Sequence, residues 1–588
     1  MNSNNGLISK VWHYMKPYQM PLYISIFLTL VQVITSVVEP FVLGLVITEL
    51  TNNVIAIAQG VPGAGINYSY IFNILVIYLI RGWANQLSTY GANYYITEAV
   101  QQMIRDLRVD IIRKINRLPI AYFDRNQFGN ILSRITSDVE SVSNALQQGL
   151  LQIVYAILSI IFVTAMMLYL NWQLALIVII SMPVSYYVAR FIVNKSQKHF
   201  KAQADVLGKL NGFVQENFTG FNIIKLYNRE EKSEEEFESI TDQLADVGFK
   251  ASFLSSMMMP IVSVVSHLAY LAVALFGGML VIAGRLTIGN LQAFTQYVWQ
   301  VNQPIQTITQ LSGPLQSARA AIDRIFEILD YPEEDNEYVT HLEKDLSGQV
   351  SFNNVSFQYT EDKPLIKNFT VDVQPGEMVA IVGPTGAGKT TIINLLMRFY
   401  DVVEGSIKVD GIDIRDLPRQ EYRSQFGMVL QDAWLYEGEI KENLRFGNLN
   451  ATDEEVVEAA KAANVDHFIR TLPGGYNMRI NQESSNISLG QKQLLTIARA
   501  LLADPKILIL DEATSSVDTR LEILIQKAMN RLMQGRTSFV IAHRLSTIRE
   551  ADKILVMNEG QIIEQGTHES LLADKGFYYD LYQSQFSN

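Results

Sequence analysis

The chain has 588 residues and a formal net charge of −12. The length exceeds that of one ordinary domain, and the acidic balance argues against a nucleic-acid binder, which presents a basic face. Because the chain contains no cysteine, disulfides, thiol catalysis and cysteine-ligated metals are excluded. Apolar runs give way to shorter charged segments along the chain, so we expect a membrane domain over residues 1–317, a connector over 318–345 and a soluble domain over 346–588.

Six apolar segments in the first part each approach the roughly 20 residues that cross a bilayer. They cover residues 20–46, 68–90, 150–170, 172–193, 257–283 and 288–311. Lysine and arginine are missing between Lys16 and Arg81 but crowd the second and fourth connections. The positive-inside rule therefore places these connections, both termini and the soluble domain in the cytoplasm, at what we expect to be a bacterial cell membrane. Amphipathic spacing predicts that the membrane helices continue into the cytoplasm.

Polar residues inside the apolar segments are candidates for a transport path. Glu39 and His267 lie within predicted spans, where ionisable groups usually serve function. The sixth span carries polar side chains at three- and four-residue spacing, namely Gln292, Gln296, Trp299 and Gln303. These side chains either face a water-filled cavity or form hydrogen bonds between helices, and the sequence favours neither alternative.

The soluble part contains the pattern G-x-x-x-x-G-K-[ST] between a predicted strand and a predicted helix. Backbone N–H groups at the start of such a helix surround a phosphate. The loop comprises Gly383, Pro384, Thr385, Gly386, Ala387, Gly388, Lys389, Thr390 and Thr391. Lys389 would reach the β- and γ-phosphates, and the Thr390 hydroxyl would bind Mg²⁺. Further along, a short apolar strand ends in Asp511 and Glu512, so the sequence predicts a protein that uses ATP with Mg²⁺.

Several further motifs match one known family. They are Tyr359 in VSFQYT, Gln431 in VLQDAWLYEG, residues 487–491 as ISLGQ, Asp518 in SSVDT and His543 in IAHRLST. Over essentially its full length the chain resembles a half-size ABC exporter. The resemblance implies an all-α six-helix transmembrane domain fused to an α/β P-loop nucleotide-binding domain, active as a dimer. Within the family it most resembles one half of the bacterial heterodimeric multidrug exporters of the EfrCD and LmrCD type.

The resemblance also implies roles for individual residues. Thr390, Gln431 and Asp511 would hold Mg²⁺, directly or through water, while Glu512 would polarise the attacking water and His543 would contact the γ-phosphate. Tyr359 would stack on adenine, although an aromatic residue in a strand more often serves packing. The alternatives without a catalytic role are that Glu512 is a solvated acid and that His543 is an ordinary core histidine.

The ISLGQ segment departs from the common LSGGQ, which contacts the ATP bound by the partner chain. Ser488, Gly490 and Gln491 are retained, but Leu489 replaces a glycine. We expect the leucine to obstruct the close approach of backbone to phosphate and to restrict φ, although neutral drift is the alternative. Together with Asp518, these residues would face the ATP site of the partner chain. The sequence therefore predicts a heterodimer with one hydrolysing and one mainly ATP-holding site.

Two cytoplasmic turns resemble the coupling helices that transmit motion between the domains. The candidates are Phe123 and Asp124 in the second connection and Tyr227 and Asn228 in the fourth. As an alternative, each turn is only the tip of a helical hairpin.

The function that the resemblance implies is ATP-driven export of amphipathic small molecules, that is multidrug efflux by alternating access. A lipid or lipid-linked flippase of the same fold is the nearest rival, and it would respond to one lipid rather than to many drugs. An ATP-gated channel or a nucleotide-dependent receptor would act without stoichiometric turnover. Intact Glu512 and His543 argue against that last class, because a gate that only binds nucleotide does not need them.

Overall fold

The computed structural model describes residues 2–334, 346–360, 363–430, 433–481, 486–511, 519–542 and 545–586. The chain forms two compact units. The first comprises Met1–Arg117 and Asn126–Pro332, and the second comprises Leu118–Arg125 and Glu333–Asn588. A short segment of the second connection, Leu118–Arg125, thus belongs with the soluble part of the chain rather than with the helices on either side of it.

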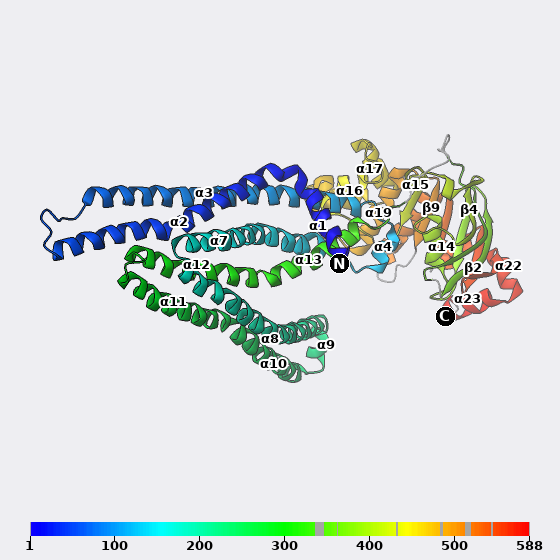
Figure 1. Ribbon diagram of the computed structural model, residues 1–588. Helices are drawn as coiled ribbons and strands as arrows, with labels where there is room; N and C mark the ends of the chain where they lie inside the picture. The colour runs from blue at the N-terminus through cyan, green and yellow to red at the C-terminus, as the bar shows by residue number, and fades with distance from the viewer. Residues whose placement is uncertain are drawn as a thin grey trace. The chain divides into compact units, whose positions relative to one another are not determined.

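The first unit is helical, and a helix lies at each of the six predicted spans (Figure 1). These helices are α2 (Gln19–Ala58), α3 (Tyr68–Ile115), α7 (Leu150–Leu170), α8 (Trp172–Thr219), α11 (Met258–Ile282) and α12 (Ile288–Gln310). With 48 residues each, α3 and α8 are roughly 70 Å long at 1.5 Å per residue, more than twice the hydrocarbon thickness. The prediction that the membrane helices extend beyond the bilayer is confirmed.

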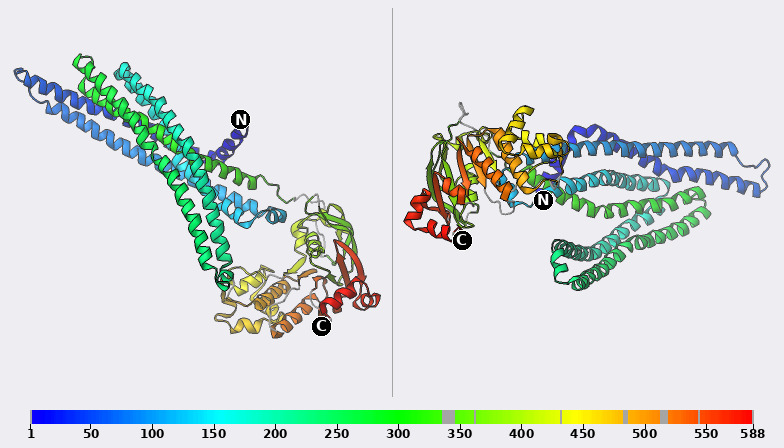
Figure 2. Two further views of the ribbon diagram at one scale, coloured as in Figure 1. Left: turned by 90° about the horizontal axis from the view of Figure 1, so that it is seen from below. Right: turned by 180° about the vertical axis from the view of Figure 1, so that it is seen from behind.

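Shorter helices continue or connect these long ones. They are α1 (Asn2–Met15), η1 (Lys16–Tyr18), α4 (Ile120–Arg125), α5 (Phe128–Ser133), η2 (Arg134–Asp138), α6 (Val139–Asn144), η3 (Ala145–Gly149), α9 (Phe221–Leu226), α10 (Glu230–Ser256) and α13 (Ser312–Leu329). The elements η2 and η3 are π-helical turns in one continuous helical segment that leads into α7. The helices α8 and α10 form a long antiparallel pair that ends at α9 (Figure 2).

Four helical segments of the described chain are long and apolar enough to cross a membrane. They are Ser9–Ala58, Phe128–Leu170, Trp172–Thr219 and Glu230–Ile282. The more polar α3 and α12 occupy the second and sixth predicted spans. The helix α12 is nevertheless a core element, because Phe294, Tyr297 and Val301 are fully buried against α2 and its neighbours. A helix that packs on several others can carry polar groups that lipid would not tolerate.

The contact between α2 and α12 compensates for a proline. Pro40 lies inside α2 and has no N–H, so the carbonyl four residues earlier, on Ser36, lacks its helical partner. The Nε2 atom of Gln300 on α12 donates to that carbonyl at 3.4 Å, and the Tyr297 hydroxyl donates to the next one, Val37, at 2.8 Å. Neighbouring side chains thus satisfy the backbone groups that a proline leaves open within a membrane.

At the other end of this contact the two backbones almost touch. A Cβ atom on Gly289 would lie only 1.7 Å from the carbonyl oxygen of Gly44, and the Gly289 N–H donates to the Thr48 hydroxyl at 3.2 Å. Small residues allow this close approach of membrane helices. The glycine pair fixes α12 against α2 beyond the proline.

The second unit is an α/β domain built on two larger sheets. The six-stranded sheet has the order β12 (Gln561–Gly566), β11 (Lys553–Asn558), β3 (Met378–Val382), β10 (Thr537–Ile541), β9 (Ile507–Asp511) and β6 (Phe426–Val429). All neighbours except β12 and β11 are parallel. Helices cover parallel sheets on both faces, which explains why β3, β9 and β10 are almost entirely buried.

An antiparallel sheet and a set of helices complete this unit. The antiparallel sheet has the order β2 (Pro364–Val373), β1 (Val350–Gln358), β4 (Glu404–Val409) and β5 (Ile412–Asp413), and β7 (Gly438–Glu439) pairs with β8 (Arg479–Ile480). The helices are α14 (Lys389–Leu396), η4 (Ile414–Asp416), α15 (Arg419–Arg423), α16 (Ile440–Arg445), α17 (Asp453–Ala462), α18 (Asp466–Thr471), η5 (Gly475–Asn477), α19 (Leu489–Ala503), α20 (Thr519–Met533), α21 (Leu545–Glu550), α22 (His568–Asp574) and α23 (Phe577–Phe586). The predicted fold class is confirmed.

Candidate functional site

Strand register brings the predicted nucleotide motifs to one edge of the six-stranded sheet. Ile381 of β3 pairs with Ile541 of β10, which pairs with Asp511 of β9, and Leu510 of β9 pairs with Val429 of β6. These four adjacent strands are parallel, so their following loops leave from the same edge, where α/β sheets bind ligands. Gln431, Glu512, Asp518 and His543 lie outside the described residues. In the sequence, Gln431, Glu512 and His543 follow these strand ends by one or two positions.

The phosphate-binding loop joins β3 to α14, as predicted, and requires glycine at two tight positions. Gly383 has a φ of +154°, and a Cβ atom there would lie 2.2 Å from the carbonyl oxygen of Met557. Gly388 is the left-handed N-cap of α14 with a φ of +97°, and a Cβ atom would lie 2.7 Å from Ile366. The first N–H groups of α14 have no partners within the helix and are free for an anion. The loop therefore fits a phosphate group.

Lys389 lies within this loop. Its ammonium group donates to the carbonyl oxygens of Gly383 at 2.8 Å and Pro384 at 3.0 Å. Burial lowers the pKa of Lys389, and the nearby Asp511 carboxylate opposes that effect. The Thr390 side chain is exposed on the same turn, as a Mg²⁺ ligand requires. The residues described here supply a cation for phosphate and oxygen donors for a hard metal ion.

Ring contacts and hydrogen bonds of the hydroxyl fix the position of the Tyr359 side chain. Its ring makes T-shaped contacts with Phe357 and Tyr400 at centroid distances of 4.9 and 5.0 Å. The hydroxyl donates to the Thr391 hydroxyl at 3.5 Å and accepts from the Asn394 amide at 3.3 Å. The side chain remains 36 % exposed. Tyr359 thus lies beside the start of α14 with a rigid ring, which suits the predicted stacking role.

The first coupling candidate contacts this same aromatic cluster. Phe123 and Asp124 lie in α4, which belongs to the second unit. The Tyr400 hydroxyl donates to the Asp124 carboxylate, and the Arg125 guanidinium donates to the carbonyl oxygen of Tyr359 at 3.4 Å. Burial and the hydrogen bond to Asp124 raise the pKa of Tyr400. Tyr400 therefore links α4 to the tyrosine predicted to bind adenine, and no sequence motif had singled it out.

We expect Tyr400→Phe to reduce transport more than ATP binding. The change keeps the ring contact with Tyr359 but removes the hydrogen bond to Asp124, so nucleotide-driven movement should reach α4 less effectively. Losing one such bond should lower transport per ATP hydrolysed by roughly three- to tenfold. Parallel transport and ATPase assays in vesicles measure this ratio.

Tyr476→Phe is the matched control, because that hydroxyl also donates to an aspartate, Asp466, at 2.6 Å but lies elsewhere in the second unit. An unchanged ratio in Tyr400→Phe, or an equal change in the control, would contradict the relay.

The second coupling candidate lies at the free end of the α8–α10 pair. Helix α9 ends at Leu226, so Tyr227 and Asn228 lie just after the helix, and Asn228 adopts a left-handed φ of +50°. Ile223, Leu226 and Tyr227 expose 59 %, 69 % and 67 % of their surface. This apolar tip is suited to contact with another surface.

The conformation at Leu489 bears on the expectation that a leucine at this position restricts φ. Ser488 is the N-cap of α19 and forms a capping box with Gln491, whose side chain accepts from the Ser488 N–H at 3.0 Å. Leu489 is the first helical residue and is not among the described residues with positive φ. The restriction of φ by a leucine therefore causes no strain, because the first helical position accepts any L-residue. The side chain is 44 % exposed, so steric obstruction is the effect that remains.

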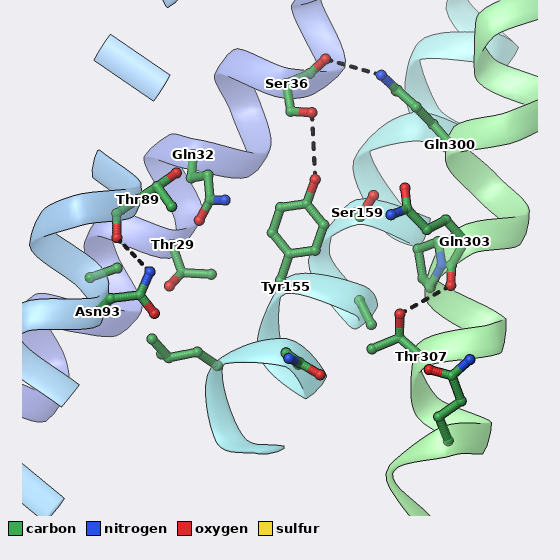
Figure 3. Close-up of a pocket in the computed structure, with 16 residues that line it drawn as sticks. Thr29, Gln32, Ser36, Thr89, Asn93, Tyr155, Ser159, Gln300, Gln303 and Thr307 are labelled. Atoms are coloured by element: carbon green, nitrogen blue, oxygen red, sulfur yellow. Dashed lines mark hydrogen bonds between the residues drawn. The ribbon is translucent and has the colours of Figure 1, made fainter. Parts of the chain in front are cut away.

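A polar cavity of about 570 Å³ lies among α2, α3, α7 and α12 in the first unit (Figure 3). Uncharged polar side chains dominate its lining, which includes Thr29, Gln32, Ser36, Asn93, Tyr155, Gln300, Gln303 and Gln310. The Oε1 atom of Gln300 is buried without a hydrogen-bond partner among the described residues. Of the residues predicted for the transport path, Gln303 lines this cavity, whereas Glu39, His267, Gln292, Gln296 and Trp299 are not among its lining residues.

Glu39 instead forms an ion pair between α2 and α3. Its carboxylate lies 2.9 Å from the Arg81 guanidinium and accepts from the Tyr78 hydroxyl at 2.8 Å. Arg81 also donates to the carbonyl oxygen of Thr35 at 2.9 Å. Pairing of this kind allows ionisable groups inside a membrane domain. His267 and Trp299 pair with each other in a T-shaped contact at 4.9 Å between α11 and α12.

Comparisons with known proteins agree with this architecture. The family described as the ABC transporter transmembrane region matches residues 22–305, and the family described as ABC transporter matches residues 366–515. The solved structure of a bacterial Atm1-family ABC exporter with ATP bound superposes with a TM-score of 0.78 at 26 % identity, over 97 % of this chain and 99 % of that one.

Bacterial relatives are named for three different substrates. The fatty acid ABC transporter ATP-binding/permease protein of Mycobacterium tuberculosis is 45 % identical over 521 residues, 89 % of this chain and 82 % of that protein. The ATP-dependent lipid A-core flippase of Syntrophus aciditrophicus is 35 % identical over 87 % of this chain and 85 % of that protein. The putative multidrug export ATP-binding/permease protein YgaD of Bacillus subtilis is 34 % identical over 99 % of this chain and all of that protein.

The helical membrane unit, the parallel sheet and the phosphate-binding loop at its edge define a membrane-spanning exporter driven by an ATP-hydrolysing domain. The chain belongs to the ABC transporter family, as a half-size exporter with the Atm1-family fold. Half-transporters of this family act as dimers within the membrane.

Proposed function

We propose that this chain is the hydrolysis-competent half of a heterodimeric exporter that moves amphipathic small molecules out of the cell by alternating access. ATP binding would close two nucleotide-binding domains, the helices would open outward, and hydrolysis would reset the inward-open state. The polar, uncharged cavity bounded by four helices is the observation that supports this substrate class. Such a lining binds by several weak hydrogen bonds and has no fixed charge that would select one ion.

Residues at the sheet edge would carry out the ATP chemistry. Lys389 and the amides of the phosphate-binding loop would neutralise the phosphates, and Thr390, Asp511 and Gln431 would hold Mg²⁺, which supplies further positive charge. Glu512 follows Asp511 in the chain and would orient the attacking water, with His543 at the γ-phosphate. The shared edge of β3, β10, β9 and β6 supports this assignment.

We expect Gln303→Ala to change which compounds are exported while basal ATPase stays close to that of the unmodified protein. Gln303 lines the polar cavity, and removing one of its weak contacts should alter transport of individual compounds by roughly two- to fivefold. A transport assay with a chemically mixed panel, in vesicles that contain the whole dimer, gives the ranking.

The control is Gln296→Ala, which removes the same amide from the same helix away from the cavity lining. An unchanged ranking in Gln303→Ala, or the same change in both variants, would show that the cavity does not select substrates.

Lipid transport is the second candidate, supported by the relatives named for fatty acid and lipid A. A flippase would show ATPase stimulation by one lipid class and little response to the mixed panel. An ATP-gated channel or nucleotide-dependent receptor would show conductance or signalling without one round of hydrolysis per transported molecule. Transport of the mixed panel, lipid-stimulated ATPase and conductance, measured in the same vesicles, therefore separate the three proposed functions.

Leu489 supports the proposal that the dimer contains two different chains. Each ATP site in the dimer would combine the phosphate-binding loop of one chain with the ISLGQ-type segment of the other. Two copies of this chain would form two sites that each contain the exposed Leu489 side chain. A partner with an unobstructed segment would instead give one complete site with Lys389 and Glu512.

We expect Leu489→Ala to raise the ATPase of this chain when it is expressed without a partner. The change removes most of the obstructing side chain and preserves helix propensity at the start of α19. Relief of a steric clash of about 1–3 kcal/mol corresponds to roughly a 5- to 150-fold faster turnover. Steady-state phosphate release measures it.

Leu449→Ala, at another exposed leucine of the second unit, should leave turnover unchanged. Equal turnover of Leu489→Ala and the unmodified chain would remove Leu489 as the cause of the asymmetry.

A further inference from the structure

A second cavity lies in the first unit, away from the polar one. Its volume is about 640 Å³, within the range of pockets that enclose small ligands. The walls come from α1, the start of α2, the segment from α6 through η3 into α7, and α13. Apart from Arg319 and the ring nitrogen of Trp12, the lining side chains are apolar, among them Met15, Leu146 and Ala318.

Helix α1, which lines the cavity, is held near the end of α13 by two side-chain contacts. Near the end of α13, the rings of Tyr14 and Phe326 meet at 6.3 Å, and the Lys10 ammonium group contacts the Asp330 carboxylate. Leu315, Ala318 and Ile322 of α13 line one side of the cavity, and the π-helical turn η3 contributes a further wall. The space is therefore bounded by three separate segments rather than by one loose loop.

All of these walls lie at the cytoplasmic ends of predicted spans. Met15 and Leu22 lie on either side of the start of the first span, Leu146 and Leu150 flank the start of the third, and Leu315 follows the end of the sixth. Tryptophan side chains such as Trp12 are typical of this interface. The cavity thus lies at the level of the inner leaflet, where the apolar chains of lipids meet their headgroups.

Arg319 differs in its ion pairing from Arg324, which also lies on α13, and from Arg134, which contacts that helix. The Arg324 guanidinium lies 2.8 Å from the buried Asp138 carboxylate, and Arg134 lies 2.9 Å from Glu327. Arg319 is exposed and, within the described part of the chain, has no carboxylate within ion-pair distance, even though Asp323 is one turn away. An apolar cavity with a free cation at its edge is complementary to an amphiphile with a negative headgroup.

We propose that this cavity binds one acyl chain of an acidic phospholipid from the inner leaflet, with the headgroup phosphate at Arg319. The lipid fills the space between α1, η3 and α13, and so holds α1 in place at the membrane surface. A zwitterionic lipid offers the same chain without net negative charge, so Arg319 provides the selectivity. The site is distinct from the polar cavity and does not depend on which molecule the protein exports.

Native mass spectrometry of the intact dimer, taken from nanodiscs, tests lipid retention. We expect phosphatidylglycerol to remain bound in preference to phosphatidylcholine. Arg319→Gln should reduce retained phosphatidylglycerol about fivefold and leave phosphatidylcholine unchanged. Leu146→Trp, which fills the cavity while Arg319 is intact, should reduce it as well. Equal retention of both lipids by the unmodified dimer, or no loss in either variant, would overturn the proposal.

The absence of cysteine from the chain allows a second test by labelling. Ala318→Cys places one thiol in the cavity lining, and Ser317→Cys places one on the same helix outside it. In nanodiscs, phosphatidylglycerol should slow maleimide labelling of Ala318→Cys several-fold relative to phosphatidylcholine, and Arg319→Gln should abolish that difference. Protection of Ala318→Cys that is equal in both lipids would show that the partner chain covers the cavity, and would overturn the proposal.

Discussion

The Glu512→Gln variant should bind ATP with nearly normal affinity but hydrolyse it roughly 10²–10⁴-fold more slowly. The amide keeps the size of the side chain but cannot accept a proton from the attacking water. Glu512 directly follows Asp511, whose strand β9 lies next to β10 and β6, so the change affects the reacting end of the site. Steady-state ATPase and equilibrium nucleotide binding of the purified complex measure the two effects separately.

Glu437→Gln, at an exposed acid in the same unit, serves as the matched control and should hydrolyse ATP normally. Turnover of Glu512→Gln close to that of the control would remove Glu512 from the catalytic role.

Lys389→Ala should weaken ATP binding itself, by roughly 10- to 100-fold, in addition to slowing hydrolysis. The Lys389 ammonium lies among the carbonyl oxygens of the phosphate-binding loop, and no other side chain described at this loop carries a positive charge. Its loss removes a counter-charge from the bound state as well as from the transition state. Titration with a fluorescent ATP analogue measures the affinity.

Lys367→Ala removes an exposed lysine of β2 and should leave the affinity unchanged. If Lys389→Ala bound ATP as tightly as this control and lost only turnover, then Lys389 would act in the transition state alone.

The phosphate-binding loop between β3 and α14, and the apolar strand that ends at Asp511, were predictable because their geometry is local. A glycine-rich loop between strand and helix, and carboxylates at the end of an apolar strand, are determined by a few consecutive residues. Parallel pairing of β3, β10 and β9 then brings Ile381, Ile541 and Asp511 side by side. The helix lengths were also predictable, since hydrophobic periodicity continued well past the apolar spans.

Contacts between distant residues were not predictable from the sequence. The link from Asp124 to Tyr400 joins residues 276 positions apart, and nothing in either local pattern indicates it. The polar face of α12 looked uniform, yet Gln303 lines the cavity and Gln296 does not, because the cavity depends on which residues of α2, α3 and α7 lie opposite each position. The helical conformation of Leu489, directly after the N-cap residue Ser488, was not predicted from the sequence either.

We propose that this chain completes one hydrolysing site only together with a different half-transporter chain. The most direct measurement compares substrate-stimulated ATPase of this chain purified alone with that of the complex it forms with its co-purifying partner, reconstituted in the same lipid. We expect little stimulated turnover for the chain alone and strong stimulation for the complex. A stable homodimer of this chain with fully stimulated turnover would contradict it.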